Sequence, residues 1–273
     1  MNLKLIFMYD LNFAIGILSW KGYDSLENSL YSYEKNGLSS LTKFKFVCLQ
    51  EYTKKGIKIV EKYDYEPILL RENLGILGGF KKLAEKMPDG PLLLLENDLE
   101  LIEDKKTTYK QIKQSIDFLN EHEIIQVRLR SKFHPGEPFE GLKKYREYWS
   151  NSIISKTKRF LRPNKANKLI GTSIYALENP ETHHPHLVKK LIDGFYLVPS
   201  SILNWANLAI LVDRETYLNR IIWKAEQTNS KKFINGFKNI EIELNNSWWR
   251  KKEFNILVAP GLFTHNRLSF RGY

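Results

Sequence analysis

The first half of the chain alternates continuous apolar stretches with amphipathic stretches of helical length, and this alternation constrains the fold more than any other feature. Apolar runs without alternation are typical of strands buried on both faces of a parallel sheet. Strands joined through helices form right-handed βαβ units. We expect strands at 13–20, 43–50, 66–72, 91–98 and 124–130, and helices at 23–33, 53–63, 76–87 and 107–122. The sequence therefore predicts an α/β fold, with a Rossmann-like, mainly parallel central sheet and helices on both faces.

The second half is less regular. Residues 131–168 are basic and rich in turns, whereas 254–265, "FNILVAPGLFTH", predicts a late buried strand that returns to the sheet. A chain of 273 residues can bury one large core. We expect a single domain over residues 1–273.

Composition narrows the cellular setting and the partner. Cys48 is the single cysteine, which excludes an intramolecular disulfide and a cysteine-based zinc site and fits a reducing compartment. The apolar run at the N-terminus is broken at Asp10 and Asn12, so it is too short for a signal sequence or a membrane span. We expect a soluble, cytoplasmic protein. The net charge of +11 predicts an anionic partner, and peripheral contact with a membrane is one alternative.

Polar residues follow the predicted strands at the edge where parallel sheets bind ligands. The pairs Ser19-Trp20, Gln50-Glu51 and Glu72-Asn73 and the triplet Glu96-Asn97-Asp98 should converge there. Carboxylates that emerge from a buried strand are costly unless they are paired or bind a cation, and Mg²⁺ and Mn²⁺ prefer oxygen ligands. The alternative, a helix cap with solvated acids, is less favoured after the fourth strand of such a sheet.

A glycine-rich turn, "ENLGILGGF" (72–80), precedes the third helix. Its glycines Gly75, Gly78 and Gly79 would let the backbone approach a ligand at a helix N-terminus, which favours negative charge. The spacing is not that of the dinucleotide fingerprint G-x-G-x-x-G. A purely structural turn remains equally compatible with this motif.

In their order along the chain, "ILSW", "LQE", "ENLGILGGF" and "END" resemble glycosyltransferases of the GT-A fold, and family 2 in particular. The resemblance covers residues 13–130 and, more loosely, 195–266. It implies that Glu96-Asn97-Asp98 stands in place of the family's Asp-x-Asp motif, with Asp98 as the metal ligand and Glu96 and Asn97 against the donor. It also implies a nucleotide-sugar-binding half at 13–130 and an acceptor-binding half at 131–273.

The resemblance assigns further roles. It implies that Ser19, Trp20 and Glu51 contact the base and that Asn73, Gly78 and Gly79 border the donor. "NIEIEL" (239–244) is similar to the segment that carries the catalytic base, which makes Glu241 the candidate and Glu243 its nearest rival. "GLFTH" (261–265) resembles the late strand that delivers a histidine, His265, to the metal.

The implied activity is metal-dependent transfer of a sugar from a nucleoside-diphosphate sugar to a hydroxyl of a glycan or glycoconjugate. A divalent ion neutralises the departing diphosphate, and a carboxylate within reach removes the acceptor proton. An imidazole ligand favours Mn²⁺ over Mg²⁺. A UDP-sugar is favoured and a GDP-sugar is the alternative; a base opposite the leaving group predicts inversion.

Two other functions compete with this one. A nucleotidyltransferase would want a basic, Gly-rich loop after the first strand, where the chain offers only Lys21 and Gly22. A non-enzymatic nucleic-acid-binding protein would explain the charge, but we expect no stable nucleic-acid partner. The basic run 143–168 is either a solvated face or a surface for an anionic or lipid-linked acceptor. "THHPH" (182–186) predicts a surface loop rather than a second metal site.

Overall fold

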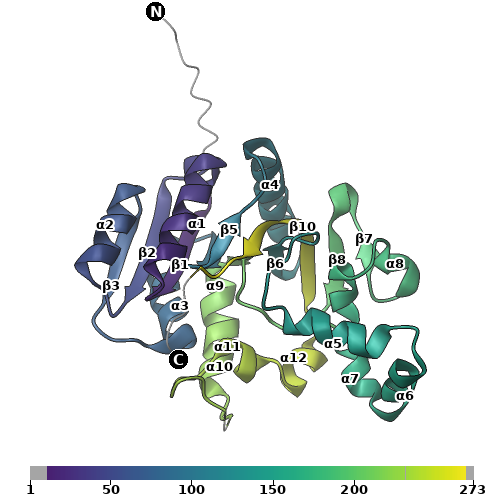
Figure 1. Ribbon diagram of the computed structural model, residues 1–273. Coiled ribbons are helices and arrows are strands. Elements are labelled where there is room, and N and C mark those ends of the chain that lie inside the picture. The colour runs from purple at the N-terminus through teal and green to yellow at the C-terminus, as the bar shows by residue number, and fades with distance from the viewer. Residues whose placement is uncertain (1–10, 231, 269–273) are drawn as a thin grey trace, which may run out of the picture.

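The computed structural model describes residues 11–230 and 232–268. Its centre is a ten-stranded sheet of order β3-β2-β1-β4-β9-β6-β10-β8-β7, with β5 paired to β10, and helices pack on both faces (Figure 1). The strands are β1 Ala14–Trp20, β2 Phe44–Gln50, β3 Glu66–Leu70, β4 Pro91–Glu96, β5 Leu99–Leu101, β6 Ile124–Arg130, β7 Lys189–Lys190, β8 Tyr196–Pro199, β9 Ile210–Asp213 and β10 Asn255–His265.

The first half forms the predicted parallel βαβ units. β1 pairs in parallel with β2 on one side and β4 on the other, and β3 continues the sheet beyond β2. The connecting helices are α1 Tyr23–Lys35, α2 Lys54–Lys62, α3 Gly75–Lys86 and α4 Lys105–Glu121, and a 3₁₀ turn lies at Leu38–Ser40. The predicted strands and helices of this half are therefore confirmed, with ends that agree to within two residues.

Successive residues of β1 face different cores, which explains why the strand is apolar throughout. Ala14 and Leu18 belong to the core under α3, whereas Ile15 and Ile17 belong to the core under α1 and α4. Cys48 of β2 is fully buried in the α3-side core. Because both faces are covered, apolar residues occupy consecutive positions of β1 rather than every second one.

The second half makes the sheet mixed. β9 lies between β4 and β6 and runs antiparallel to both, and β8 runs antiparallel to β10, which is itself parallel to β6. The parallel core of the prediction is confirmed, while these added antiparallel strands were not foreseen. The helical segments of this half are α5 Glu140–Trp149, α6 Ile153–Leu161, α7 Pro163–Asn167, α8 Pro180–His183, α9 Arg214–Thr216, a π-helix at Tyr217–Ile222, α10 Trp223–Gln227, α11 Ile240–Leu244 and α12 Ser247–Lys252, with 3₁₀ turns at Ile170–Tyr175 and Ile192–Gly194.

The predicted late strand is β10, and it bends. Its pairing with β6 shifts register between Val258 and Phe263. Within this irregularity Gly261 has φ of +98°, and a Cβ there would lie 2.3 Å from the carbonyl oxygen of Arg130. Only glycine fits this close approach. After the bend β10 pairs with β5, which brings His265 opposite Leu99, next to Asp98.

The region predicted as basic and turn-rich is mainly helical. Tyr145, Tyr148, Ala166 and Leu169 form a small separate core that joins α5 to α7. Among the described residues, no helix combines the length and the apolar character that crossing a membrane requires.

Candidate functional site

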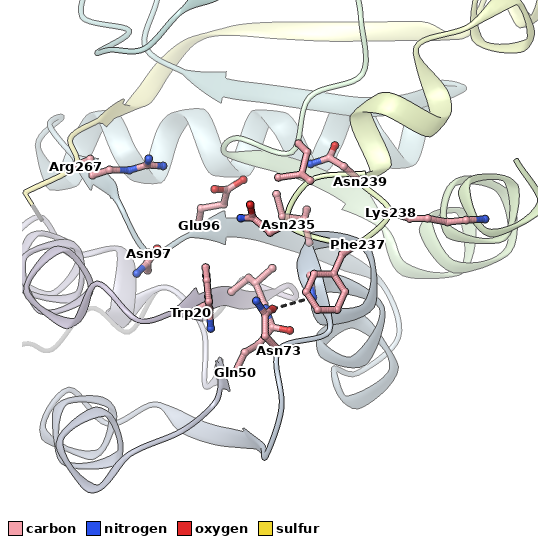
Figure 2. Close-up of a pocket in the computed structure, with 14 residues that line it drawn as sticks. Trp20, Gln50, Asn73, Glu96, Asn97, Asn235, Phe237, Lys238, Asn239 and Arg267 are labelled. Atoms are coloured by element: carbon pink, nitrogen blue, oxygen red, sulfur yellow. Dashed lines mark hydrogen bonds between the residues drawn. The ribbon is translucent and has the colours of Figure 1, made fainter. Parts of the chain in front are cut away.

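A cavity of about 300 Å³ opens at the carboxyl ends of β1 and β4. Trp20, Glu96 and Asn97 line it from the sheet, while the start of α3 and the loop before α11 line it from the side (Figure 2). The loop contributes Phe237 and Lys238, and Arg267 lies at the opposite wall. The cavity therefore lies at the sheet edge where the sequence places the ligand.

Trp20 and Glu51 form one unit at the mouth of the site. The Trp20 indole Nε1 donates a hydrogen bond to Glu51 Oε2 at 2.7 Å, and Lys21 Nζ lies 3.7 Å from the same oxygen. The Lys21 ammonium also lies 4.7 Å from the centre of the Trp20 ring. Ser19, by contrast, is buried, and its hydroxyl donates to the carbonyl of Lys21 at 3.4 Å. Trp20 is thus the member of the predicted base-contacting group that lines the cavity.

The glycine-rich turn is held from two sides. Asn73 Oδ1 accepts a hydrogen bond from the Gly75 N–H at 2.8 Å, the dashed line in Figure 2. Gln50 Oε1 accepts one from the Leu74 N–H at 2.8 Å. Asn73 and Gly75 line the cavity, and Gly75 has φ of +68° with space only for hydrogen, because a Cβ would lie 2.4 Å from Phe237 Cβ.

The two glycines predicted to border the donor serve packing. A Cβ on Gly79 would meet Leu18 at 2.6 Å and Gln50 at 3.1 Å, so Gly79 lets α3 approach β1 and β2. A Cβ on Gly78 would meet the side chain of Leu74 at 2.7 Å. Gly75, which the sequence indicated only as part of the turn, is the glycine at the cavity wall.

The three residues Glu96, Asn97 and Asp98 at the end of β4 have different environments. The Glu96 side chain is half-buried and lies at the cavity (Figure 2). Asn97 is buried, and its amide donates to the carbonyls of Lys21 and Gly22 at 3.0 and 3.2 Å, which fixes the turn after β1. Asp98 is fully buried, and its backbone carbonyl accepts from Asn266 N–H at 2.8 Å.

The Asp98 carboxylate receives two groups from the end of β10. His265 Nε2 lies 3.1 Å and Arg267 Nε 3.0 Å from Asp98 Oδ2. The structure therefore brings together the two residues predicted as metal ligands, 167 positions apart along the chain. Two neighbouring ligands about 2.1 Å from one divalent ion lie about 3 Å apart, so the Asp98–His265 separation fits a shared ion. No group of three acidic, histidine or cysteine side chains suited to a metal occurs among the described residues. The Arg267 guanidinium contacts the same Asp98 oxygen, so a bound ion would share that oxygen with Arg267 or displace the guanidinium.

Glu241 lies at the start of α11, just beyond the cavity wall. Asn239, which lines the cavity, caps this helix by accepting from Glu241 N–H at 2.9 Å. Glu241 Oε1 accepts from Asn207 N–H at 3.0 Å. Burial raises the pKa of Glu241, while the Asn207 N–H and the guanidinium groups of Arg128 and Arg130 oppose that rise. A carboxyl with a raised pKa is suited to proton transfer near neutral pH.

Glu243, the rival base, is fully buried and holds the loop before α11. It accepts hydrogen bonds from the Ser230 hydroxyl at 2.6 Å and from the Ser230 N–H at 3.3 Å. Both of its oxygens are engaged in this anchoring, so the geometry favours Glu241 for a role with substrate.

Two buried arginines near Glu241 were not anticipated. Arg130 donates to the carbonyls of Pro135 and Gly136 at 2.6 and 2.9 Å, and Arg128 donates to the carbonyl of Asn204. Burial lowers the pKa of both guanidinium groups. They were missed because "VRLR" signals only a strand, and their neighbours come from distant loops.

The histidine-rich segment is consistent with the predicted surface location. His183 and His186 are exposed, and the His184 ring packs edge-on against Trp149 with centroids 4.9 Å apart.

Comparison with known proteins gives a fold but no sequence family. No protein-family model matches the chain, and no curated protein matches its sequence. Among solved structures, residues 1–349 of S. aureus TarS align with 94% of this chain at a TM-score of 0.52 and 12% identity. The same protein in complex with UDP-GlcNAc aligns with 96% at 0.53 and 13% identity, and in complex with UDP with 93% at 0.51 and 13%.

The chain covers 60% of TarS 1–349 and 37% of a longer TarS structure. At this identity the likeness establishes the fold, which is the GT-A fold that the sequence motifs implied.

Proposed function

We propose that this protein is a glycosyltransferase that moves a sugar from a nucleoside-diphosphate sugar to a hydroxyl group of a glycan or glycoconjugate. The observation that carries the proposal is the cavity at the carboxyl ends of β1 and β4, directly beside the paired Asp98 and His265. A protein of the same fold has been solved with UDP-GlcNAc and with UDP. Ligands of open α/β sheets bind at this edge.

We infer that the donor carries uridine rather than guanosine. The solved protein of the same fold carries UDP-GlcNAc in one structure and UDP in another, and this supports a uridine donor. Trp20 supplies an aromatic surface at the mouth, and the Asn73–Gly75 turn supplies a wall where backbone can approach the ligand.

The diphosphate would lie toward Arg267. Arg267 lines the cavity next to Asp98, and guanidinium groups match phosphate oxygens. Asp98 and His265 would hold a divalent ion, with Mn²⁺ favoured over Mg²⁺, and that ion would neutralise charge on the leaving diphosphate. Glu96 would contact the donor or water around the ion.

Glu241 would take the acceptor proton. Its side chain retains partial exposure although the surrounding protein raises its pKa, so the group is both reachable and a stronger base than an ordinary carboxylate. Asn207 N–H and the Asn239 cap fix its position. Attack by an acceptor from that side, opposite the diphosphate, would invert the anomeric configuration.

Calorimetric titration tests the proposal. We expect UDP to bind more tightly than GDP and to bind more tightly with Mn²⁺ than without it. Asp98→Ala should lose the Mn²⁺-dependent part of the affinity, whereas Asp117→Ala, which removes a half-exposed carboxylate on α4, should behave as wild type.

Failure of the folded protein to bind either nucleotide, with or without Mn²⁺, would overturn the proposal. Strong, steeply salt-dependent binding of RNA or DNA in the same conditions would instead favour the nucleic-acid-binding function.

A further inference from the structure

The second half of the chain carries an exposed apolar cluster far from the cavity, on helix α6. Its members are Ile153, Ile154, Phe160 and Leu161, whose exposed fractions are 81%, 69%, 85% and 69%. Phe160 and Ile153 are the two most exposed large apolar side chains among the described residues. A cluster of this kind on a soluble surface marks an interaction site.

The four side chains share one side of the helix. At 3.6 residues per turn, positions 153, 154, 157, 160 and 161 fall within an arc of about 120°. Lys156 and Lys158 lie at the two borders of this arc. Figure 1 shows α6 with α7 at the edge of the molecule, away from the sheet. This is the pattern of a helix that lies in a membrane interface, with its basic residues flanking the buried face.

The opposite side of α6 is firmly attached, so the apolar face is a fixed feature of the surface. Ser152 caps the helix by accepting from Ser155 N–H at 3.1 Å, and the Ser155 hydroxyl donates to the Glu147 carbonyl at 2.7 Å. Arg159 donates to the Tyr148 carbonyl at 2.5 Å, and its guanidinium lies 5.1 Å from the centre of the Trp149 ring. These contacts hold α6 on α5.

Positive charge surrounds the apolar cluster. Lys156, Arg162, Lys165 and Lys168 are exposed, and none of them forms an ion pair with a carboxylate of the described residues. Lys158 is the exception, at 3.5 Å from Glu147. Cations near an anionic bilayer add to the affinity of an inserted apolar face.

We propose that α6 docks this protein onto a bilayer that contains anionic lipids. The Ile153, Ile154, Phe160 and Leu161 side chains enter the boundary between headgroups and acyl chains, and the lysines and arginines around them contact lipid phosphates. The inference is independent of the nucleotide-sugar proposal, because it uses no residue of the cavity.

Other occupants fit less well. In a twofold contact between two copies, the same patch would face itself, which would bring the basic residues of both copies together. Single-stranded nucleic acid stacks on aromatic rings, whereas three of the four exposed side chains here are aliphatic. A mainly aliphatic face surrounded by lysines and arginines therefore fits a lipid surface better than either of these occupants.

Co-sedimentation of the full chain with vesicles tests the proposal. We expect at least tenfold stronger binding to vesicles of phosphatidylcholine and phosphatidylglycerol in equal amounts than to phosphatidylcholine alone. Ile153→Ser with Phe160→Ser should weaken binding to the anionic vesicles at least tenfold, and the matched control Phe133→Ser, at an apolar side chain 73% exposed elsewhere, should not. The charge variant Lys156→Glu with Arg162→Glu should also weaken it, unlike Lys54→Glu with Lys58→Glu on α2.

The replaced side chains are exposed, so the melting temperatures should match wild type and binding losses should not reflect unfolding. Wild-type levels of binding in the serine variant, or no binding of wild type to either vesicle, would overturn the proposal. So would a dimer in gel filtration that the serine variant converts to monomer without any change in vesicle binding, or tight RNA binding that the charge variant abolishes while vesicle binding persists.

Discussion

Glu241→Gln tests two effects of the Glu241 carboxylate separately: the stability lost when it is charged in a desolvated position, and its proposed role as a base. Glutamine has nearly the shape of the protonated carboxyl and can still accept from the Asn207 N–H. The fold raises the pKa of Glu241, chiefly through burial, so it favours the protonated form. The contribution of Glu241 to the stability of the wild type is therefore fully present below the ordinary carboxyl pKa and is lost as pH rises through the raised pKa. Glutamine does not titrate, so the variant loses no stability through this position over the same pH range.

The difference in melting temperature between the variant and the wild type depends on how far the pKa of Glu241 is raised. Each unit corresponds to about 1.4 kcal/mol, and a chain of 273 residues unfolds with an entropy of about 0.57 kcal/mol per degree. Each unit should therefore raise the melting temperature of Glu241→Gln above wild type by about 2–3 °C at pH 8. The difference should vanish near pH 4, and differential scanning calorimetry at several pH values measures it.

The variant should be more stable than the wild type at pH 8 but less active. With a UDP-sugar and an acceptor, Glu241→Gln should lose about 10²–10⁴-fold in kcat while its affinity for UDP stays unchanged. Glu243→Gln is the matched control: one of the oxygens that accept from Ser230 becomes a donor, so it should lower the melting temperature. A melting temperature of Glu241→Gln below wild type at pH 8 would refute the reasoning, because Arg128 and Arg130 would then outweigh burial.

Two further substitutions address the walls of the cavity. Gly75→Ala places a Cβ 2.4 Å from Phe237 Cβ at a φ of +68°, so it should lower stability by about 1–3 kcal/mol and weaken UDP binding; unchanged urea midpoint and UDP affinity would contradict this. Trp20→Phe keeps an aromatic ring but removes the 2.7 Å hydrogen bond to Glu51, so UDP affinity by calorimetry should fall a few-fold with little change in melting temperature. Loss of stability without loss of affinity would assign Trp20 to packing alone.

The sequence predicted the N-terminal half of the fold because burial on both faces leaves a local signal. β1 and β4 are nearly continuous apolar runs, and the buried apolar side chains of the helices α1 to α4 recur at helical spacing. The same logic fails for β9, which is four residues long and takes its place between β4 and β6 through non-local antiparallel pairing. Helix α6 was not predicted because its apolar pairs, 153–154 and 160–161, face solvent and are separated by a polar, basic run.

The candidate site was accessible from sequence where topology alone positions a residue. The ends of β1 and β4 converge by the rules of parallel sheets, which located Trp20, Glu96 and Asp98. The pairing of Asp98 with His265 was expected only from family resemblance, and Arg267 as their third member was not foreseen. Their contact depends on the bend of β10 at Gly261. That bend arises where Gly261 packs against the backbone of Arg130, and no local sequence pattern predicts this contact.

The single thiol of the chain is placed where it can report on the integrity of the sheet. Cys48 is fully buried in β2, and burial raises its pKa to about 12, so the nucleophilic thiolate is scarce at neutral pH and no reagent can reach it in the closed protein. Alkylation thus proceeds only when β2 separates from its neighbours or from α3. The alkylation rate therefore measures how often this part of the sheet opens, and the native cysteine serves without any engineered one.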